Sequence, residues 1–186
     1  MRSASLVRSA RARPRAEAVL PALAIALGCL ALASRPLAWR SVATLVLVGV
    51  IGLLGPVAVR EQRAGRARWL AATGLGAAAF LAARMIDVPI ARPFAFAAVG
   101  MHVLAGFAEE AFFRRFVYGW LARWGVVLAI AGSAALFALV HVPQYGLAVL
   151  PIDLAAGALL GWQRWTTGSW TAPAVTHAIA NLLQMG

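Results

Sequence analysis

The chain has 186 residues, of which 62% are hydrophobic, and it carries seventeen basic residues against only six acidic ones. Soluble domains are nearer half apolar, and the apolar residues here recur in runs of about 15–20, which argues against a soluble protein. The net charge of +11 does not indicate nucleic-acid binding, because the basic residues separate the apolar runs and form no single patch. We therefore expect an all-α, polytopic transmembrane helical bundle of about seven spans, whose partner is the lipid bilayer and not a nucleic acid.

The N-terminal part reads as a basic tail followed by a first span. Residues 1–16 contain five arginines and no acid, so we expect a cytoplasmic tail that rests on anionic headgroups. The apolar run 18–33 ends in small residues before Ser34, which also resembles a signal peptide with its cleavage site. We favour an uncleaved span, because the chain continues as a polytopic protein. Cys29, the single cysteine, allows no internal disulfide and is expected to be a packing residue.

The rest of the chain alternates between apolar runs and short connections, with no soluble domain. We expect N-terminal transmembrane helices within residues 17–92 and a second part in residues 93–186. The expected helices cover residues 18–33, 41–59, 69–86, 93 through the helical pattern of 107–120, 126–141, 147–162 and 171–185. The expected connections are 87–92, a turn near 123–125, 142–146 and 163–169.

The distribution of arginine predicts the orientation of the bundle. With the N-terminus inside, thirteen of the seventeen arginines lie in inside segments, including Arg114, Arg115 and Arg164, and four lie outside. Cytoplasmic segments carry such an excess of basic residues. Every basic residue is arginine, as is common in GC-rich bacterial genomes. We therefore expect an integral protein of a bacterial inner membrane with a cytoplasmic N-terminus.

Two adjacent carboxylates, Glu109 and Glu110, stand in an apolar stretch and need a reason to be there. A charge inside a membrane is costly, so intramembrane acids usually mark function. Two carboxylates in contact disfavour each other's charge, which suits a general base or acid. Arg114 lies four residues after Glu110 and can pair with it, which leaves Glu109 the less committed of the two. The alternative is a salt-bridge cluster at a helix end.

Three motifs far apart in the sequence can converge on this pair. Glu109 lies 16 residues before Gly125 and His141 lies 16 after it, so a hairpin at Gly125 would bring them level. His177 and Asn181 are four residues apart and share a helix face. A carboxylate can accept a proton from water, and imidazole and amide groups can stabilise an oxyanion. The alternatives are a capped histidine at position 141 and an interhelical polar clamp at 177 and 181.

Two further features favour structural roles. His102 is expected to be a buried polar group with a hydrogen-bond partner and no part in catalysis. The pair Gly157 and Gly161 is expected to pack helices closely.

In these motifs the sequence resembles the CPBP family of intramembrane proteases, the CAAX-protease and bacteriocin-processing group, also called the Abi family. The family pattern Glu-Glu-x-x-x-Arg is matched by Glu109, Glu110 and Arg114. Phe-x-x-x-His is matched by Phe137 and His141, and His-x-x-x-Asn by His177 and Asn181. The resemblance covers about residues 93–185 and implies that residues 93–186 are a catalytic core. Arg115 stands where many members have glycine, and we expect it to narrow the region beside the glutamates.

The resemblance implies an endopeptidase that acts within or beside the bilayer. Glu109 and His141 would activate water, and His177 and Asn181 would form the oxyanion site. Glu110 and Arg114 would hold the geometry, and Phe137 would support it. We favour a metal-free mechanism without a cofactor, since there is no His-Glu-x-x-His motif. Zinc bound by Glu109, His141 and His177 is the alternative.

The expected substrate is a membrane-associated protein or peptide, such as a bacteriocin-like peptide or a C-terminal sorting or CAAX-like tail. Two other functions compete with proteolysis. One is a non-catalytic immunity or binding protein of the same fold. The other is a small transporter that uses the glutamates as a proton relay, although no inverted repeat is visible. The sequence does not indicate an oligomeric state.

Overall fold

The structure, a computed structural model, describes residues 13–34, 41–57, 63–86 and 96–185, and all regular elements in these ranges are helical. The expected all-α fold is confirmed for this part of the chain. The elements are α1 (Arg13–Ala33), α2 (Ser41–Leu54), α3 (Arg66–Ile86), α4 (Phe96–Glu110), η2 (Ala111–Val117), α5 (Tyr118–Leu121), η3 (Ala122–Trp124), α6 (Val126–Tyr145), η4 (Leu147–Val149), α7 (Leu150–Thr167) and α8 (Thr171–Leu183). The predicted linker 87–92 and most of the predicted tail 1–16 lie outside the described residues, although α1 begins within that tail.

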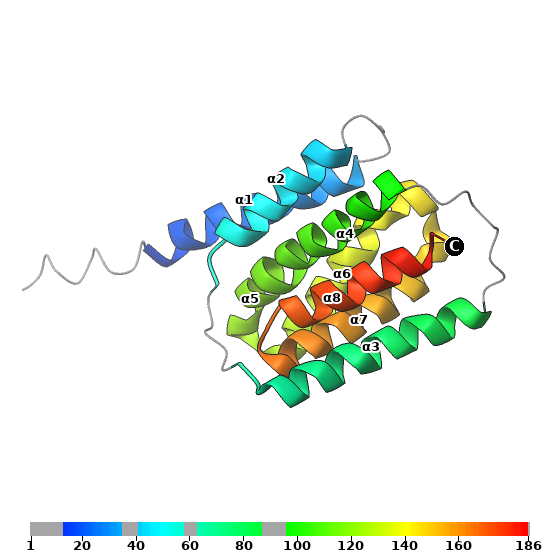
Figure 1. Ribbon diagram of the computed structural model, residues 1–186. Helices are drawn as coiled ribbons and strands as arrows, with labels where there is room; N and C mark the ends of the chain where they lie inside the picture. The colour runs from blue at the N-terminus through cyan, green and yellow to red at the C-terminus, as the bar shows by residue number, and fades with distance from the viewer. Residues whose placement is uncertain (1–12, 35–40, 58–62, 87–95, 186) are drawn as a thin grey trace, which may run out of the picture.

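The helices form one bundle with the C-terminal helices at its centre. α1 and α2 lie on one edge of the bundle and α3 lies on the opposite edge (Figure 1). α8 packs against α4, α3 and α7, and α6 packs against α7, α1 and α5. Helices from the two halves of the sequence therefore share one interior.

One helical run carries the Glu-Glu-x-x-x-Arg motif through the middle of the bundle. It begins as α4, widens into the π-helix η2 directly after Glu110, and continues through α5 to a turn at Gly125, whose φ of 115° suits glycine. All but one of the residues in η2 are buried. π-Helical turns are rare and frequent at functional sites. The predicted turn near 123–125 is confirmed.

α2 packs closely against this π-helix. A Cβ atom on Gly52 would overlap the backbone of Ala111 and Phe112, so only glycine allows the approach. Nη1 of Arg115 donates to the carbonyl oxygens of Gly52 (2.6 Å) and Gly55 (3.0 Å), which stand at the C-terminal end of α2. The prediction that Arg115 narrows the region beside the glutamates was therefore wrong, because orphan helix-end carbonyls draw the guanidinium towards α2.

The connection predicted for residues 163–169 is shorter than expected. α7 continues to Thr167 and ends at Gly168, which has the left-handed φ of 61°. Nε2 of Gln163 donates to the carbonyl oxygen of Ala72 (2.7 Å) and to the hydroxyl of Thr176 (2.9 Å). These partners on α3 and α8 satisfy the buried Gln163 side chain, so α7 can continue beyond the point at which the sequence predicted its end.

Three of the arginines counted for the orientation have partners inside the bundle. Arg164 is 5% exposed, and its Nε donates to the carbonyl oxygen of Arg114, which is itself fully buried. Arg115 binds carbonyls within the bundle. These contacts do not test the predicted orientation, which stays a prediction.

α6 is longer than the sequence indicated. It runs four residues past His141 to Tyr145 with Pro143 inside it, and it ends at Gly146, whose φ is 79°. A Cβ atom on Gly157 of α7 would lie 2.9 Å from Cα of Ala134 on α6. The predicted packing role of the Gly157 and Gly161 pair is therefore confirmed.

The described surface carries many large apolar side chains, and several charged side chains are buried. Large apolar side chains such as Leu20, Leu54 and Val127 are 74%, 80% and 77% exposed, while Glu110 and Arg114 are fully buried. Among the described residues, one helix, Val126–Tyr145, has the length and hydropathy needed to cross a membrane, and Ala18–Ala33 and Val42–Leu54 are shorter apolar helices. Length and composition thus identify one candidate span where about seven were expected.

Candidate active site

The two glutamates end α4 and point into different surroundings. Glu109 is 2% exposed and lines a cavity, and Glu110 is fully buried beneath it. An α-helix turns about 100° per residue, so neighbouring side chains cannot share one environment. The adjacency of the pair in sequence therefore produces one carboxylate that faces the cavity and one that faces the bundle interior.

Glu110 is the centre of a buried cluster of charged and polar side chains. Its Oε1 accepts hydrogen bonds from Nη1 of Arg114 (2.9 Å) and from Nδ1 of His177 on α8 (2.9 Å). Nη2 of Arg114 donates to the carbonyl oxygen of Gly157 on α7 (3.1 Å). The predicted pairing of Glu110 with Arg114 is confirmed, and the cluster ties α4, α7 and α8 together around one carboxylate.

Phe137 lies beneath both imidazoles and the guanidinium. Its ring centroid is 4.7 Å from that of His141 and 5.6 Å from that of His177. Cζ of Arg114 stands 4.7 Å from the same ring. A desolvated cation over an aromatic face is stabilised by about 2 kcal/mol. Phe137 therefore packs against three polar groups and helps to position them, which agrees with the supporting role that the resemblance implied.

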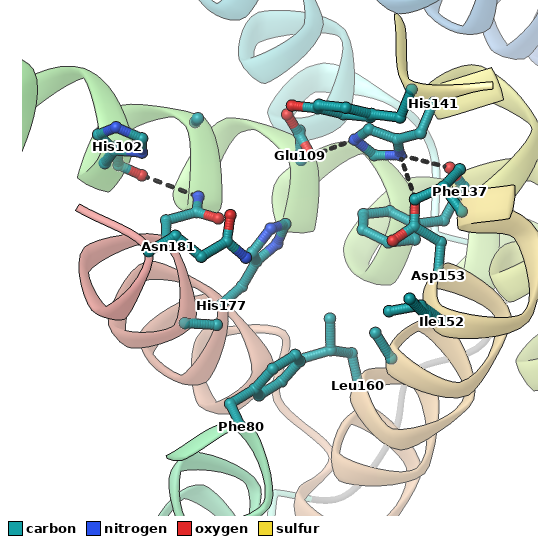
Figure 2. A pocket seen from close by; sticks show the side chains of 16 residues that line it. Phe80, His102, Glu109, Phe137, His141, Ile152, Asp153, Leu160, His177 and Asn181 are labelled. Carbon is teal, nitrogen blue, oxygen red and sulfur yellow. Dashed lines mark hydrogen bonds and ion pairs between the residues drawn. The ribbon is translucent and has the colours of Figure 1, made fainter. Parts of the chain in front are cut away.

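Glu109 and His141 face each other across the hairpin. Nε2 of His141 lies 3.8 Å from Oε2 of Glu109, as the equal distances from Gly125 predicted. On the other side of the ring, Nδ1 lies 2.8 Å from the carbonyl oxygen of Phe137 and 3.4 Å from Oδ2 of Asp153 on α7 (Figure 2). The imidazole thus stands between two carboxylates from different helices.

Asn181 and His177 lie on one face of α8, as expected from their spacing. Nδ2 of Asn181 donates to the carbonyl oxygen of His102 (3.1 Å), so the backbone of His102 orients the amide. An amide group has two donors, which leaves its second N–H for another acceptor. Figure 2 shows Glu109, His141, His177 and Asn181, from α4, α6 and α8, around one hollow.

This hollow is a cavity of about 300 Å³. Tyr145 and Ile152, which line it at the end of α6 and the start of α7, are 57% and 68% exposed, so the cavity opens at that end of the bundle. The ring of Tyr145 stacks on His141 with centroids 6.0 Å apart.

The donor atoms do not form a metal site in the described part of the chain. No group of three or more His, Cys, Asp or Glu side chains there could hold a metal ion. The metal-free mechanism stays a prediction.

Sequence reasoning missed Asp153 as a member of the site. One signal was available, because Asp153 is one of only six acids and stands alone in an apolar helix, the same argument that singled out the glutamates. Its spacing to His141 belongs to no helical period, since the chain turns at Gly146 between them. Only the packing of α6 on α7 brings the two side chains together.

A family model described as type II CAAX prenyl endopeptidase Rce1-like matches residues 91–183. The chain belongs to the Rce1-like family. The polar residues Glu109, His141, Asp153, His177 and Asn181, which line the cavity, lie within the matched residues. Comparison with curated proteins and with solved structures gave no match for this chain. At the level of the family, the chain is a CAAX-type endopeptidase related to membrane-embedded enzymes.

Proposed function

We propose that this Rce1-like protein is a polytopic intramembrane endopeptidase that hydrolyses a peptide bond in a membrane-associated substrate without a metal ion. The observation that carries the proposal is the pairing of Glu109 with His141 in a cavity that His177 and Asn181 also line. The exposed apolar surface of the bundle supports a place in a lipid bilayer, and we propose the bacterial inner membrane as that bilayer.

In this mechanism a water molecule lies between Glu109 and His141. Glu109 accepts a proton while the water oxygen forms a bond with the carbonyl carbon of the substrate, and the carbonyl oxygen becomes an oxyanion. The C–N bond then breaks, and the leaving amine takes the proton from Glu109. General-base catalysis contributes about 10²–10⁴-fold to the rate.

The oxyanion is stabilised from the α8 side of the cavity. Asn181 donates its second N–H, because the first is used on His102. His177 can donate only from Nε2, since its Nδ1 proton is used on Glu110, so it acts as an imidazolium with Glu110 as counter-ion. One preorganised donor of this kind contributes about 10²–10³-fold.

The family name points to the substrate class. Type II CAAX prenyl endopeptidases are described by the prenylated C-terminal tail on which they act, and the cavity opens at one end of the bundle. We infer a C-terminal tail of a lipid-anchored or otherwise membrane-associated protein, or a bacteriocin-like peptide, as substrate. Such a chain can lie along the apolar surface while one peptide bond enters the cavity.

The test is cleavage by the purified full chain in lipid nanodiscs. The probes are fluorescence-quenched peptides with and without a farnesylated C-terminal cysteine, and product masses give the scissile bond. Glu109→Gln keeps the shape of the side chain and should lower kcat by at least about 100-fold. Cleavage by Glu109→Gln at the wild-type rate would refute the mechanism, and binding of both probes without cleavage would favour the non-catalytic alternative.

A further inference from the structure

Asp153 lines the cavity and is much less exposed than the residue on either side of it. Its side chain is 17% exposed, while Ile152 and Leu154 are 68% and 42% exposed. Asp153 stands in the first turn of α7, where the helix dipole stabilises a negative charge. The stabilisation by the helix dipole does not explain why Asp153 is buried, because an exposed carboxylate at the start of a helix is stabilised in the same way.

The buried oxygen of Asp153 lies beside the His141 ring. Oδ2 is buried and accepts no hydrogen bond there, and Nδ1 of His141 lies 3.4 Å from it. Burying a carboxylate oxygen without compensation is unfavourable. A partial positive charge on His141 is the compensation that this geometry offers.

The surroundings of His141 also fix where its protons lie. Nδ1 faces two acceptors, the carbonyl oxygen of Phe137 and Oδ2 of Asp153, so it carries a proton. Nε2 faces Oε2 of Glu109. In a neutral ring with its proton on Nδ1, Nε2 is an acceptor, and the carboxylate oxygen of Glu109 is an acceptor too. A further proton or a water molecule is therefore needed between Nε2 and Glu109, which is the position of the attacking water in the proposed function.

We propose that Asp153 is a positioning residue that holds the His141 ring with Nδ1 protonated and Nε2 aimed at Glu109. This inference rests on the proposed function. The negative charge of Asp153 favours the proton on Nδ1, so Nε2 remains an acceptor for one proton of the water while Glu109 takes the other. Asp153 thus acts through His141 and does not touch the substrate.

The closing experiment compares kcat, KM and the thermal midpoint in nanodiscs with the same peptide probes. Asp153→Asn keeps the size but removes the charge, and should lower kcat at least about tenfold with KM and the thermal midpoint unchanged. Asp153→Glu should recover most of the rate. Leu154→Asn introduces the same side chain on the exposed neighbour and should leave kcat unchanged.

A double-mutant cycle separates action through His141 from a general effect on folding. In a His141→Gln background, Asp153→Asn should cause no further loss of the residual rate. An equal loss in both backgrounds would overturn the inference, because Asp153 would then act independently of His141. So would a wild-type kcat for Asp153→Asn.

The kcat of Glu109→Gln tests the proposed function separately from the role of Asp153. If Glu109→Gln is inactive while Asp153→Asn is fully active, only the role of Asp153 is wrong. If Glu109→Gln keeps the wild-type rate, the proposed function fails whatever Asp153→Asn does.

Discussion

A methyl group added at Gly106 should lower turnover by displacing His177. Gly106 stands one turn before Glu109 on α4, and a Cβ atom there would lie 2.8 Å from the backbone nitrogen and 2.9 Å from Cα of Ala178 on α8. Ordinary contacts begin near 3.4 Å, so the two helices must separate by about 0.6 Å. Ala178 follows His177 in the chain, so the hydrogen bond to Glu110 lengthens from 2.9 Å to about 3.5 Å.

The effect of this separation on stability is smaller than its effect on rate. Overpacking costs about 1–3 kcal/mol, and replacing glycine by alanine within a helix returns about 1 kcal/mol, so Gly106→Ala should destabilise the fold by about 0–2 kcal/mol. A displacement of about 1 Å in a catalytic group can cost about 100-fold in rate. We therefore expect kcat to fall about 10- to 100-fold while the protein remains folded.

The assay measures kcat and the thermal midpoint of Gly106→Ala beside a matched control. Gly100→Ala makes the same change on the same helix, where an added Cβ would meet no heavy atom within 4 Å. This control should keep the wild-type kcat. A Gly106→Ala protein that turns over within about twofold of wild type, at an unchanged thermal midpoint, would refute the reasoning that α4–α8 spacing sets the site.

Three further changes test other parts of the site. Glu110→Gln should lower yield, thermal midpoint and rate together, because breaking a buried ion pair such as that with Arg114 costs about 3–5 kcal/mol. A well-folded, inactive Glu110→Gln beside an active Glu109→Gln would mean that the catalytic and the structural role of the two glutamates are reversed. Arg115→Met should lower the thermal midpoint and leave kcat unchanged, since each hydrogen bond from the guanidinium to the carbonyls of Gly52 and Gly55 contributes about 1.5–3 kcal/mol. A loss of kcat in a protein of wild-type stability would instead place Arg115 in the active site. Treatment with 1,10-phenanthroline should leave cleavage intact and elemental analysis should give less than one zinc per chain, whereas activity lost with the metal and regained on its return would establish a zinc mechanism.

Local spacing in the sequence accounts for a large part of the site. The four-residue interval between Glu110 and Arg114 predicted an ion pair that the structure contains, even though the intervening turn is π-helical. The equal distances of Glu109 and His141 from Gly125 placed the two residues level on a hairpin. Helical periodicity and chain reversal are properties of the local chain, so the sequence alone determines them.

Only the tertiary structure decided which partners meet across the bundle. Sequence spacing did not indicate that Asp153 would reach His141, or that the carbonyl oxygen of His102 would orient Asn181, because each of these contacts joins two different helices. It also did not indicate that Arg115 would bind the end of α2. Buried polar groups must find partners wherever packing provides them. The sequence therefore determined which side chains could take part in the chemistry, and the packing of α4, α6, α7 and α8 determined which of them face one another, since no local period relates residues on different helices.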